Sequence, residues 1–133
     1  MGITKNKSYE DLQVWQQAIE LAVIMYNVTR SFPADEKFGL TSQMRRAAYS
    51  VGSNIAEGCS RNGVNEFQQF LGIAQGSLAE LKTQAIIAQR VDLLPKEKFE
   101  VIIAQIDVVG RMLNALQNSL RKSTSNQQLV TSN

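Results

Sequence analysis

The sequence predicts an all-α protein, folded as an antiparallel up-down-up-down four-helix bundle. Apolar residues recur at three- and four-residue steps in four long segments, which is the spacing of one helix face. The two prolines, Pro33 and Pro95, fall between these segments, so each segment can form an uninterrupted helix. The connections are short, and short connections favour antiparallel neighbours.

Length and composition fit one bundle domain with short flanks. The chain has 133 residues, of which 44% are hydrophobic, enough to bury one core. We expect a flexible N-terminal lead over residues 1–8, the bundle over residues 9–121 and a disordered polar tail over residues 122–133. No apolar run approaches the ~20 residues that cross a bilayer, so no membrane partner is expected. The single cysteine, Cys59, cannot form an intrachain disulfide and suits a cytoplasmic protein.

The first helix is expected over residues 9–31, with Ser8 as its cap and two acidic residues in its first turn. One apolar stripe contains Leu12, Trp15, Ile19, Ala22, Tyr26 and Thr29, and another contains Val14, Ala18, Leu21, Met25 and Val28. A helix that is apolar over so wide an arc needs cover on more than one side. In a small bundle, the additional cover often comes from another subunit.

The second helix, expected over residues 35–60, combines an apolar face with a polar stripe. The apolar face contains Met44, Ala48, Val51 and Ile55, and the polar stripe contains Gln43, Arg46, Ser50, Asn54 and Glu57. A solvated face usually carries long charged residues, whereas serine and asparagine are poor helix formers at interior positions. The stripe therefore predicts a buried or half-buried hydrogen-bond network against a partner surface.

The third and fourth helices are expected over residues 64–91 and 96–121. The third carries an apolar stripe of Phe67, Leu71, Ala74, Leu78, Leu81, Ala85 and Ala88. The fourth carries Phe99, Ile102, Ile106, Val109, Leu113, Leu116 and Leu120 in a three-four alternation, which indicates an inward-facing row. Proline at position 95 is well placed to open the fourth helix.

The turn near residues 61–63 sets the expected register between the second and third helices. If they fold back there, opposed residue numbers sum to roughly 125. Arg46 then lies near Glu80, and Ser50 lies near Gly76 and Ser77. Asn54 lies near Gly72. Ser77 and Glu80 therefore join the predicted polar network. Arg45 points about 100° away from Arg46 and is expected to be exposed.

Two glycines of the third helix, Gly72 and Gly76, lie one turn apart. Because glycine is unfavourable inside a helix, the pair suggests that another backbone approaches closely there. The alternative is that a glycine is merely tolerated at one of these positions.

Residues 43–58 (Gln-Met-Arg-Arg-Ala-Ala-Tyr-Ser-Val-Gly-Ser-Asn-Ile-Ala-Glu-Gly) closely resemble the signature of the bacterial 23S rRNA intervening-sequence protein family, also called four helix bundle proteins. Residues 11–15 with Ala18, and residues 70–80, resemble further parts of the family pattern. The resemblance implies a bundle that assembles into a ring-shaped homopentamer. It also implies an association with the ribosome by gene location rather than by demonstrated chemistry.

The resemblance also raises nucleic acid as a partner. Related proteins serve as accessory subunits of diversity-generating retroelements, where a basic pentamer looks to bind nucleic acid and a reverse transcriptase. This chain departs from that subgroup because its net charge is only +2. A fivefold ring multiplies a local patch, so contacts with nucleic acid or a protein partner are expected at Arg45, Tyr49, Arg61, Lys82 and Arg90. Tyr49 is the best candidate for stacking on a base.

No catalytic, cofactor-binding or metal-binding residues are predicted, and the chain is not expected to be an enzyme. It contains no histidine, which removes the commonest general base and any histidine-ligated metal site. Cys59 is expected near a helix C-terminus, where the dipole opposes thiolate formation. The favoured function is an oligomeric scaffold or interaction module. The alternative is a protein that binds structured RNA, or an accessory subunit of a reverse transcriptase.

Overall fold

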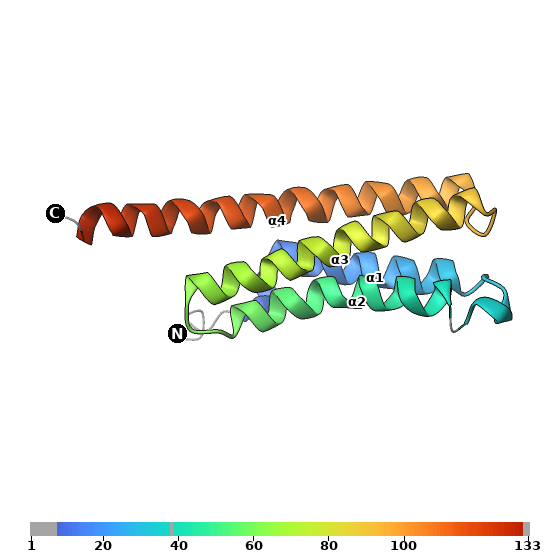
Figure 1. The fold of residues 1–133 in the computed structure, drawn as a ribbon, viewed down its shortest axis with the longest axis horizontal. Coiled ribbons are helices and arrows are strands. Elements are labelled where there is room, and N and C mark those ends of the chain that lie inside the picture. Colours follow the sequence, from blue (N-terminus) through green and yellow to red (C-terminus); the bar gives the residue numbers. More distant parts are fainter. Residues whose placement is uncertain (1–7, 38, 132–133) are drawn as a thin grey trace.

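The described residues form four long helices, which Figure 1 shows side by side. The structure, a computed structural model, describes residues 8–37 and 39–131, with side chains described through residue 123. The helices are α1 (Gln13–Thr29), α2 (Leu40–Cys59), α3 (Val64–Arg90) and α4 (Lys96–Thr131). Two short 3-10 turns, η2 (Tyr9–Asp11) and η3 (Ala34–Glu36), precede α1 and α2. The described residues include no strand, so the all-α prediction is confirmed.

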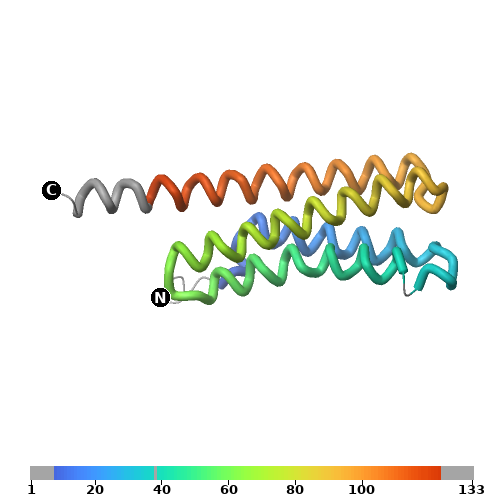
Figure 2. The backbone as a smooth tube through the Cα atoms, in the orientation of Figure 1, coloured from blue at the N-terminus to red at the C-terminus, as the bar shows by residue number. Residues whose placement is uncertain are grey.

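The helices form the predicted four-helix bundle. α1 contacts α2 and α4, and α3 contacts the same two helices. Successive helices run in opposite directions, so α1 and α3 point the same way (Figure 2). In the described residues α1 and α3 do not contact each other, and they therefore lie at opposite corners of the bundle.

The core is built from one row of apolar side chains on each helix. On α1 the row with Leu21 and Met25 is buried. In the stripe that contains Trp15, Thr29 is buried, whereas the other members are half-buried or exposed. Most apolar residues that the sequence predicted to face inward on the other helices are buried: Met44, Ala48, Val51 and Ile55 on α2; Leu71, Ala74, Leu78, Leu81, Ala85 and Ala88 on α3; and Ile102, Ile106, Val109 and Leu113 on α4. Phe67, Phe99, Leu116 and Leu120 are only partly buried, and Ala47, which was not predicted, is buried. Spacing along the sequence therefore identified the inward face of α2, α3 and α4.

The first helix begins later than the predicted residue 9. Ser8 Oγ accepts a hydrogen bond from the Glu10 backbone N–H at 3.1 Å, so Ser8 caps the η2 turn rather than α1. Leu12 has an extended backbone and separates the turn from the helix. Residues 1–7 of the predicted flexible lead lie outside the described residues.

The second helix begins at Leu40 instead of near residue 35. Pro33 opens the separate η3 turn, and Glu36 Oε1 then accepts a hydrogen bond from the Leu40 backbone N–H at 3.3 Å. A carboxylate suits this position because it meets unpaired N–H groups and the positive end of the helix dipole. Glu36 therefore caps the start of α2, whereas the sequence predicted that this residue lies inside the helix.

The third helix ends within one residue of its predicted end, in a Schellman motif. The Asp92 N–H donates to Gln89 O at 3.2 Å, and the Leu93 N–H donates to Ala88 O at 2.9 Å. Asp92 adopts a left-handed backbone with φ 65°, which this motif requires after the helix cap. The motif satisfies the last carbonyl groups of α3 and turns the chain into α4.

The fourth helix continues about ten residues beyond its predicted end near 121, to Thr131 (Figure 1). The sequence predicted a disordered polar tail from residue 122, whereas the structure assigns the backbone of residues 122–131 to α4. The sequence between Arg111 and Thr131 contains neither glycine nor proline. Once a helix has formed, each added residue contributes a further hydrogen bond, so helix propagates through polar residues that would not start one. Residues 132–133 lie outside the described residues.

Candidate functional site

A hydrogen-bond network joins the middle of α2 to the middle of α3. The Ser77 hydroxyl donates to Ser50 Oγ at 2.8 Å, and Asn54 Nδ2 donates to the Ser50 carbonyl at 2.8 Å and to its hydroxyl at 3.0 Å. Ser77 is buried, and Ser50 and Asn54 are half-buried. The Ser50–Ser77 contact agrees with the predicted register, and Ser50, Asn54 and Ser77 share a hydrogen-bond network, as the polar stripe predicted.

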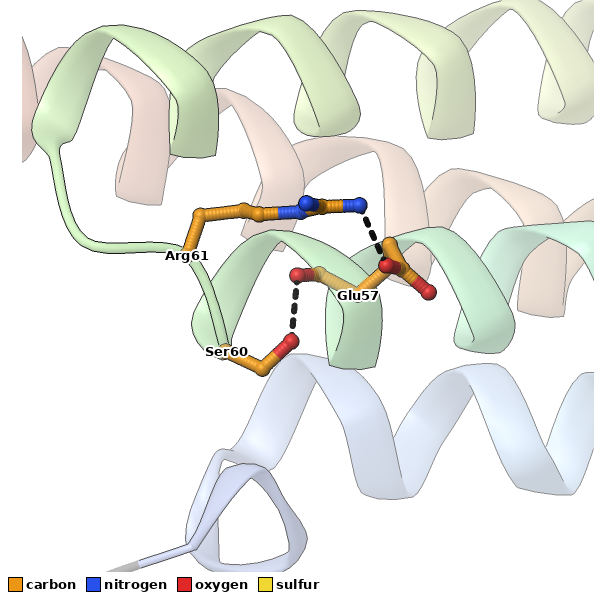
Figure 3. Close-up of polar contacts among 3 residues, drawn as sticks. All are labelled: Glu57, Ser60 and Arg61. Atoms are coloured by element: carbon orange, nitrogen blue, oxygen red, sulfur yellow. Dashed lines mark hydrogen bonds and ion pairs between the residues drawn. The ribbon is translucent and has the colours of Figure 1, made fainter.

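The ends of the polar stripe are exposed and do not join this network. Arg46 donates to Gln43 Oε1 at 3.4 Å on its own helix. Glu57 forms an ion pair with Arg61 at 2.6 Å, with both side chains more than 40% exposed (Figure 3). The Ser60 hydroxyl also donates to the Glu57 carbonyl at 2.8 Å (Figure 3). Exposed pairs of this kind contribute little to stability, so this cluster ends α2 rather than forming a binding site.

The predicted contact between Arg46 and Glu80 is wrong. Both residues are exposed, and no ion pair joins them in the described part of the chain. Arg45, predicted to be exposed, is half-buried instead: its Nε donates to Thr29 Oγ1 at 2.8 Å and its Nη2 donates to Tyr26 O at 3.3 Å. Arg45 reaches the C-terminal end of α1, where carbonyl groups lack partners within the helix. It therefore joins α1 to α2.

Arg45 also makes a cation–π contact with an exposed aromatic ring. Its guanidinium carbon lies 4.0 Å from the centre of the Tyr26 ring, and that of Arg30 lies 5.4 Å from the same centre. Tyr26 is 41% exposed. Two positive groups and one accessible tyrosine therefore share the end of α1.

An apolar surface extends from this point along α1 and onto α2. We call it the α1–α2 strip, and it consists of Ile19, Val23, Tyr26 and Tyr49, which are 39–48% exposed. A hollow of about 270 Å³ lies along it, lined by all four residues together with Ala22, Asn27 and Arg30. A second hollow of about 310 Å³ continues it toward Trp15. Contiguous apolar surface of this kind typically marks an interaction site.

The structure does not gather the predicted partner-contact residues in one place. Tyr49 belongs to the α1–α2 strip. Arg45 contacts Tyr26, another residue of this strip, through its guanidinium group. Arg61 lies in the turn between α2 and α3, where it pairs with Glu57 and its guanidinium carbon lies 5.0 Å from the Phe70 ring. Lys82 lines a groove of about 450 Å³ between α3 and α4, and Arg90 is the last residue of α3. These residues therefore do not form one basic surface within the chain.

The glycines of α3 behave differently from the prediction. A Cβ atom built at Gly72 or at Gly76 would have nothing within 4 Å, so no neighbour approaches closely there within the chain. The close contacts occur on α2. A Cβ at Gly58 would lie 2.8 Å from Phe67 Cδ1 and 2.9 Å from Phe70 Cβ, and one at Gly52 would lie 3.3 Å from Ile19 Cδ1. Gly58 thus lets the two helices meet next to their turn.

The thiol of Cys59 is half-buried at the end of α2. Burial raises the pKa of the Cys59 thiol, so its reactive thiolate form is disfavoured.

Across the described residues, no group of three or more acidic, cysteine or histidine side chains could hold a metal ion. Within the same residues, no helix combines the length and apolar character needed to cross a membrane.

Sequence reasoning missed Arg30 as a member of this site. It placed Tyr26 and Ile19 on an apolar stripe without deciding which part of that stripe faces outward. The width of the apolar arc on α1 could have indicated an exposed apolar surface, because only one of its two rows can face the core. The row of Val14, Ala18, Leu21, Met25 and Val28 is buried, so Ile19 and Tyr26 of the other row are left exposed.

In its described residues the protein is a four-helix bundle with an exposed apolar strip on α1 and α2. The model of the 23S rRNA-intervening sequence protein family matches residues 10–115. The chain belongs to this family, as its sequence signature predicted.

A solved structure has the same fold. It is described as a protein of unknown function from the S23 ribosomal protein family of Bacteroides thetaiotaomicron, and it superposes with a TM-score of 0.74. Its sequence is 23% identical, and the match covers 79% of this chain and 95% of that one. At this identity the similarity demonstrates the fold alone. No curated protein matches the chain.

Proposed function

We propose that this protein is a non-enzymatic homo-oligomer that acts as a scaffold or interaction module in the cytoplasm. The observation that supports the proposal is the α1–α2 strip, which leaves two aliphatic and two tyrosine side chains exposed side by side. Tyrosine and arginine dominate the binding energy of many protein interfaces, and Arg30 and Arg45 border the strip. A pentamer is the favoured number of copies because family resemblance implies it.

The absence of histidine from the sequence supports a role without catalysis. The raised pKa of the Cys59 thiol points the same way, since a nucleophilic cysteine needs its thiolate. Binding and assembly need neither group.

Light scattering of the unmodified chain beside a Val23→Arg variant tests this proposal. Val23 is 48% exposed, so arginine at this position is compatible with the folded bundle but places a charge in the strip. We expect the unmodified chain to have a multiple of the 14.8 kDa protomer mass and the variant to fall toward 14.8 kDa. Equal masses for the two proteins would show that the α1–α2 strip takes no part in assembly.

A second candidate, binding of structured RNA, is supported by Tyr26 and the two guanidinium groups beside it. Aromatic rings stack on bases and arginines neutralise phosphates. Fluorescence anisotropy of a labelled RNA hairpin at about 50 and about 200 mM salt tests this. We expect binding that weakens with salt and with Tyr26→Ala. No binding at the lower salt concentration would contradict it.

A further inference from the structure

Two exposed rows of residues, one on α1 and one on α3, have the same spacing. The α1 row consists of Ile19, Val23, Tyr26 and Arg30, and the α3 row consists of Gln69, Ile73, Gly76 and Glu80. In both rows the steps are four, three and four residues, the spacing with which neighbouring helices interdigitate. All eight residues are exposed.

We propose that the α1 row of one copy docks in parallel against the α3 row of a second copy. This inference rests on the proposed self-assembly and names the surface that receives the α1–α2 strip. In the matching register Val23 meets Ile73, Tyr26 meets Gly76, and Arg30 meets Glu80, while Ile19 lies against Gln69. Val23 and Ile73 are 48% and 51% exposed, so their contact removes apolar surface on both sides.

The pairing of Tyr26 with Gly76 explains why α3 carries an exposed glycine. Glycine destabilises a helix interior relative to alanine. No contact within the described residues compensates for this, because nothing lies within 4 Å of a Cβ built at Gly76. The missing side chain leaves room for the ring of Tyr26 from the next copy.

The charges select the parallel register. Arg30 and Glu80 end their rows at the same position, and in the described residues neither belongs to an ion pair. An antiparallel register keeps the spacing but places Arg30 against Gln69 and Ile19 against Glu80, so the opposite charges are not matched. Within each protomer α1 and α3 point the same way, so copies standing side by side in one orientation present the rows in parallel (Figure 2).

The two rows lie on different helices at opposite corners of the bundle, so one copy can use both at once. A contact between two different surfaces is heterologous, and repeating it builds either a closed ring or an open filament. Both rows also flank α2: Tyr49 of α2 lines the hollow beside the α1 row, and Ser77, one residue after Gly76, bonds to Ser50 of α2. Two surfaces on either side of one helix are set at an angle, which favours a ring.

Mixing two full-length variants tests the docking. Val23→Arg damages the α1 row and leaves the α3 row intact, whereas Gly76→Arg does the reverse. Gly76 has open surroundings, so the second variant is compatible with the fold, which circular dichroism checks. We expect each variant alone to remain a protomer in analytical ultracentrifugation, with association at least about tenfold weaker. The equimolar mixture should form a complex of two protomers and nothing larger, because only one intact contact remains.

A charge exchange gives an independent readout. Arg30→Glu and Glu80→Arg should each weaken association, and the chain carrying both changes should recover it, since each copy then offers the reversed pair. Ala104→Arg, on the exposed side of α4, is the matched control and should assemble normally. If the unmodified chain assembles but the mixture remains protomeric, the docking is wrong and the proposed function stands. A protomeric unmodified chain would remove both.

Discussion

The Ser77 hydroxyl of α3 lies 2.8 Å from the Ser50 hydroxyl of α2, although 27 residues separate them in the sequence. Asn54 donates to the same serine from one turn further along α2, so Ser50 is held from both helices. A buried hydroxyl needs such a partner, and only one alignment of the two helices supplies it. This contact therefore fixes how α2 and α3 are placed along each other.

Replacing Ser77 by alanine should lower the free energy of unfolding by about 0.5–1.5 kcal/mol, because a buried hydrogen bond is lost. Urea unfolding measures the change. Ser53→Ala is the control, since Ser53 is exposed on the same helix as Ser50, and its effect should stay within about 0.5 kcal/mol. Equal effects for the two variants would show that the contact with Ser50 adds nothing.

Arg45→Met should destabilise the protein by about 1–2 kcal/mol, because Thr29 and the Tyr26 carbonyl lose their donor and the Tyr26 ring loses its cation. Arg46→Met provides a matched comparison at the adjacent residue. Arg46 is exposed, and its change should stay within about 0.5 kcal/mol. Thermal unfolding of both variants measures which change destabilises the protein more. A larger loss of stability in Arg46→Met would contradict the contact of Arg45 with α1.

Two glycine-to-alanine changes should have opposite signs. Gly58→Ala places a Cβ 2.8 Å from Phe67 Cδ1 and 2.9 Å from Phe70 Cβ, so we expect a loss of about 1–3 kcal/mol from forced repacking. Gly72→Ala meets nothing within 4 Å and should gain about 0.5–1 kcal/mol through better helix propensity. Denaturant unfolding of both variants decides this. A stabilised Gly58→Ala variant would contradict the close approach near the turn.

The alignment of α2 and α3 could be predicted from the sequence because their connection is short. A short turn leaves little freedom, so counting outward from it placed Ser50 near Gly76 and Ser77. The start of α2 could not be found in this way. Glu36 was expected inside the helix, whereas its side chain caps Leu40 from the preceding turn, and side-chain capping depends on local backbone geometry.

The sequence predicted that Arg45 is exposed and that Arg46 contacts another helix, and the structure shows the reverse for a related reason. Helical spacing gives their angle to one another but not which of them faces a third helix. The answer depends on where α1 ends, since Thr29 supplies the acceptor for Arg45. The sequence also could not predict that Gly76 has no close neighbour within the chain. A glycine inside a helix suggests that another group approaches closely, but it does not indicate whether that group belongs to the same chain.

The Cys59 thiol should react slowly while the protein is folded. Burial raises its pKa, so at a given pH the folded chain contains less thiolate than the unfolded chain. The unfolded thiol therefore loses its proton first, and stability should fall as the pH rises from the unfolded-state pKa to the folded-state pKa. Alkylation with iodoacetamide near about pH 8 should be slower in the folded than in the urea-unfolded protein. Equal rates would contradict the burial, and Cys59→Ser provides the blank.

Self-assembly through the α1–α2 strip is tested most directly by sedimentation equilibrium of the unmodified full-length chain across micromolar concentrations. We predict a species several times heavier than the 14.8 kDa protomer, and five times heavier for the favoured pentamer. A single species of 14.8 kDa over the whole range would contradict the assembly, because the exposed strip would then have no second copy to cover it.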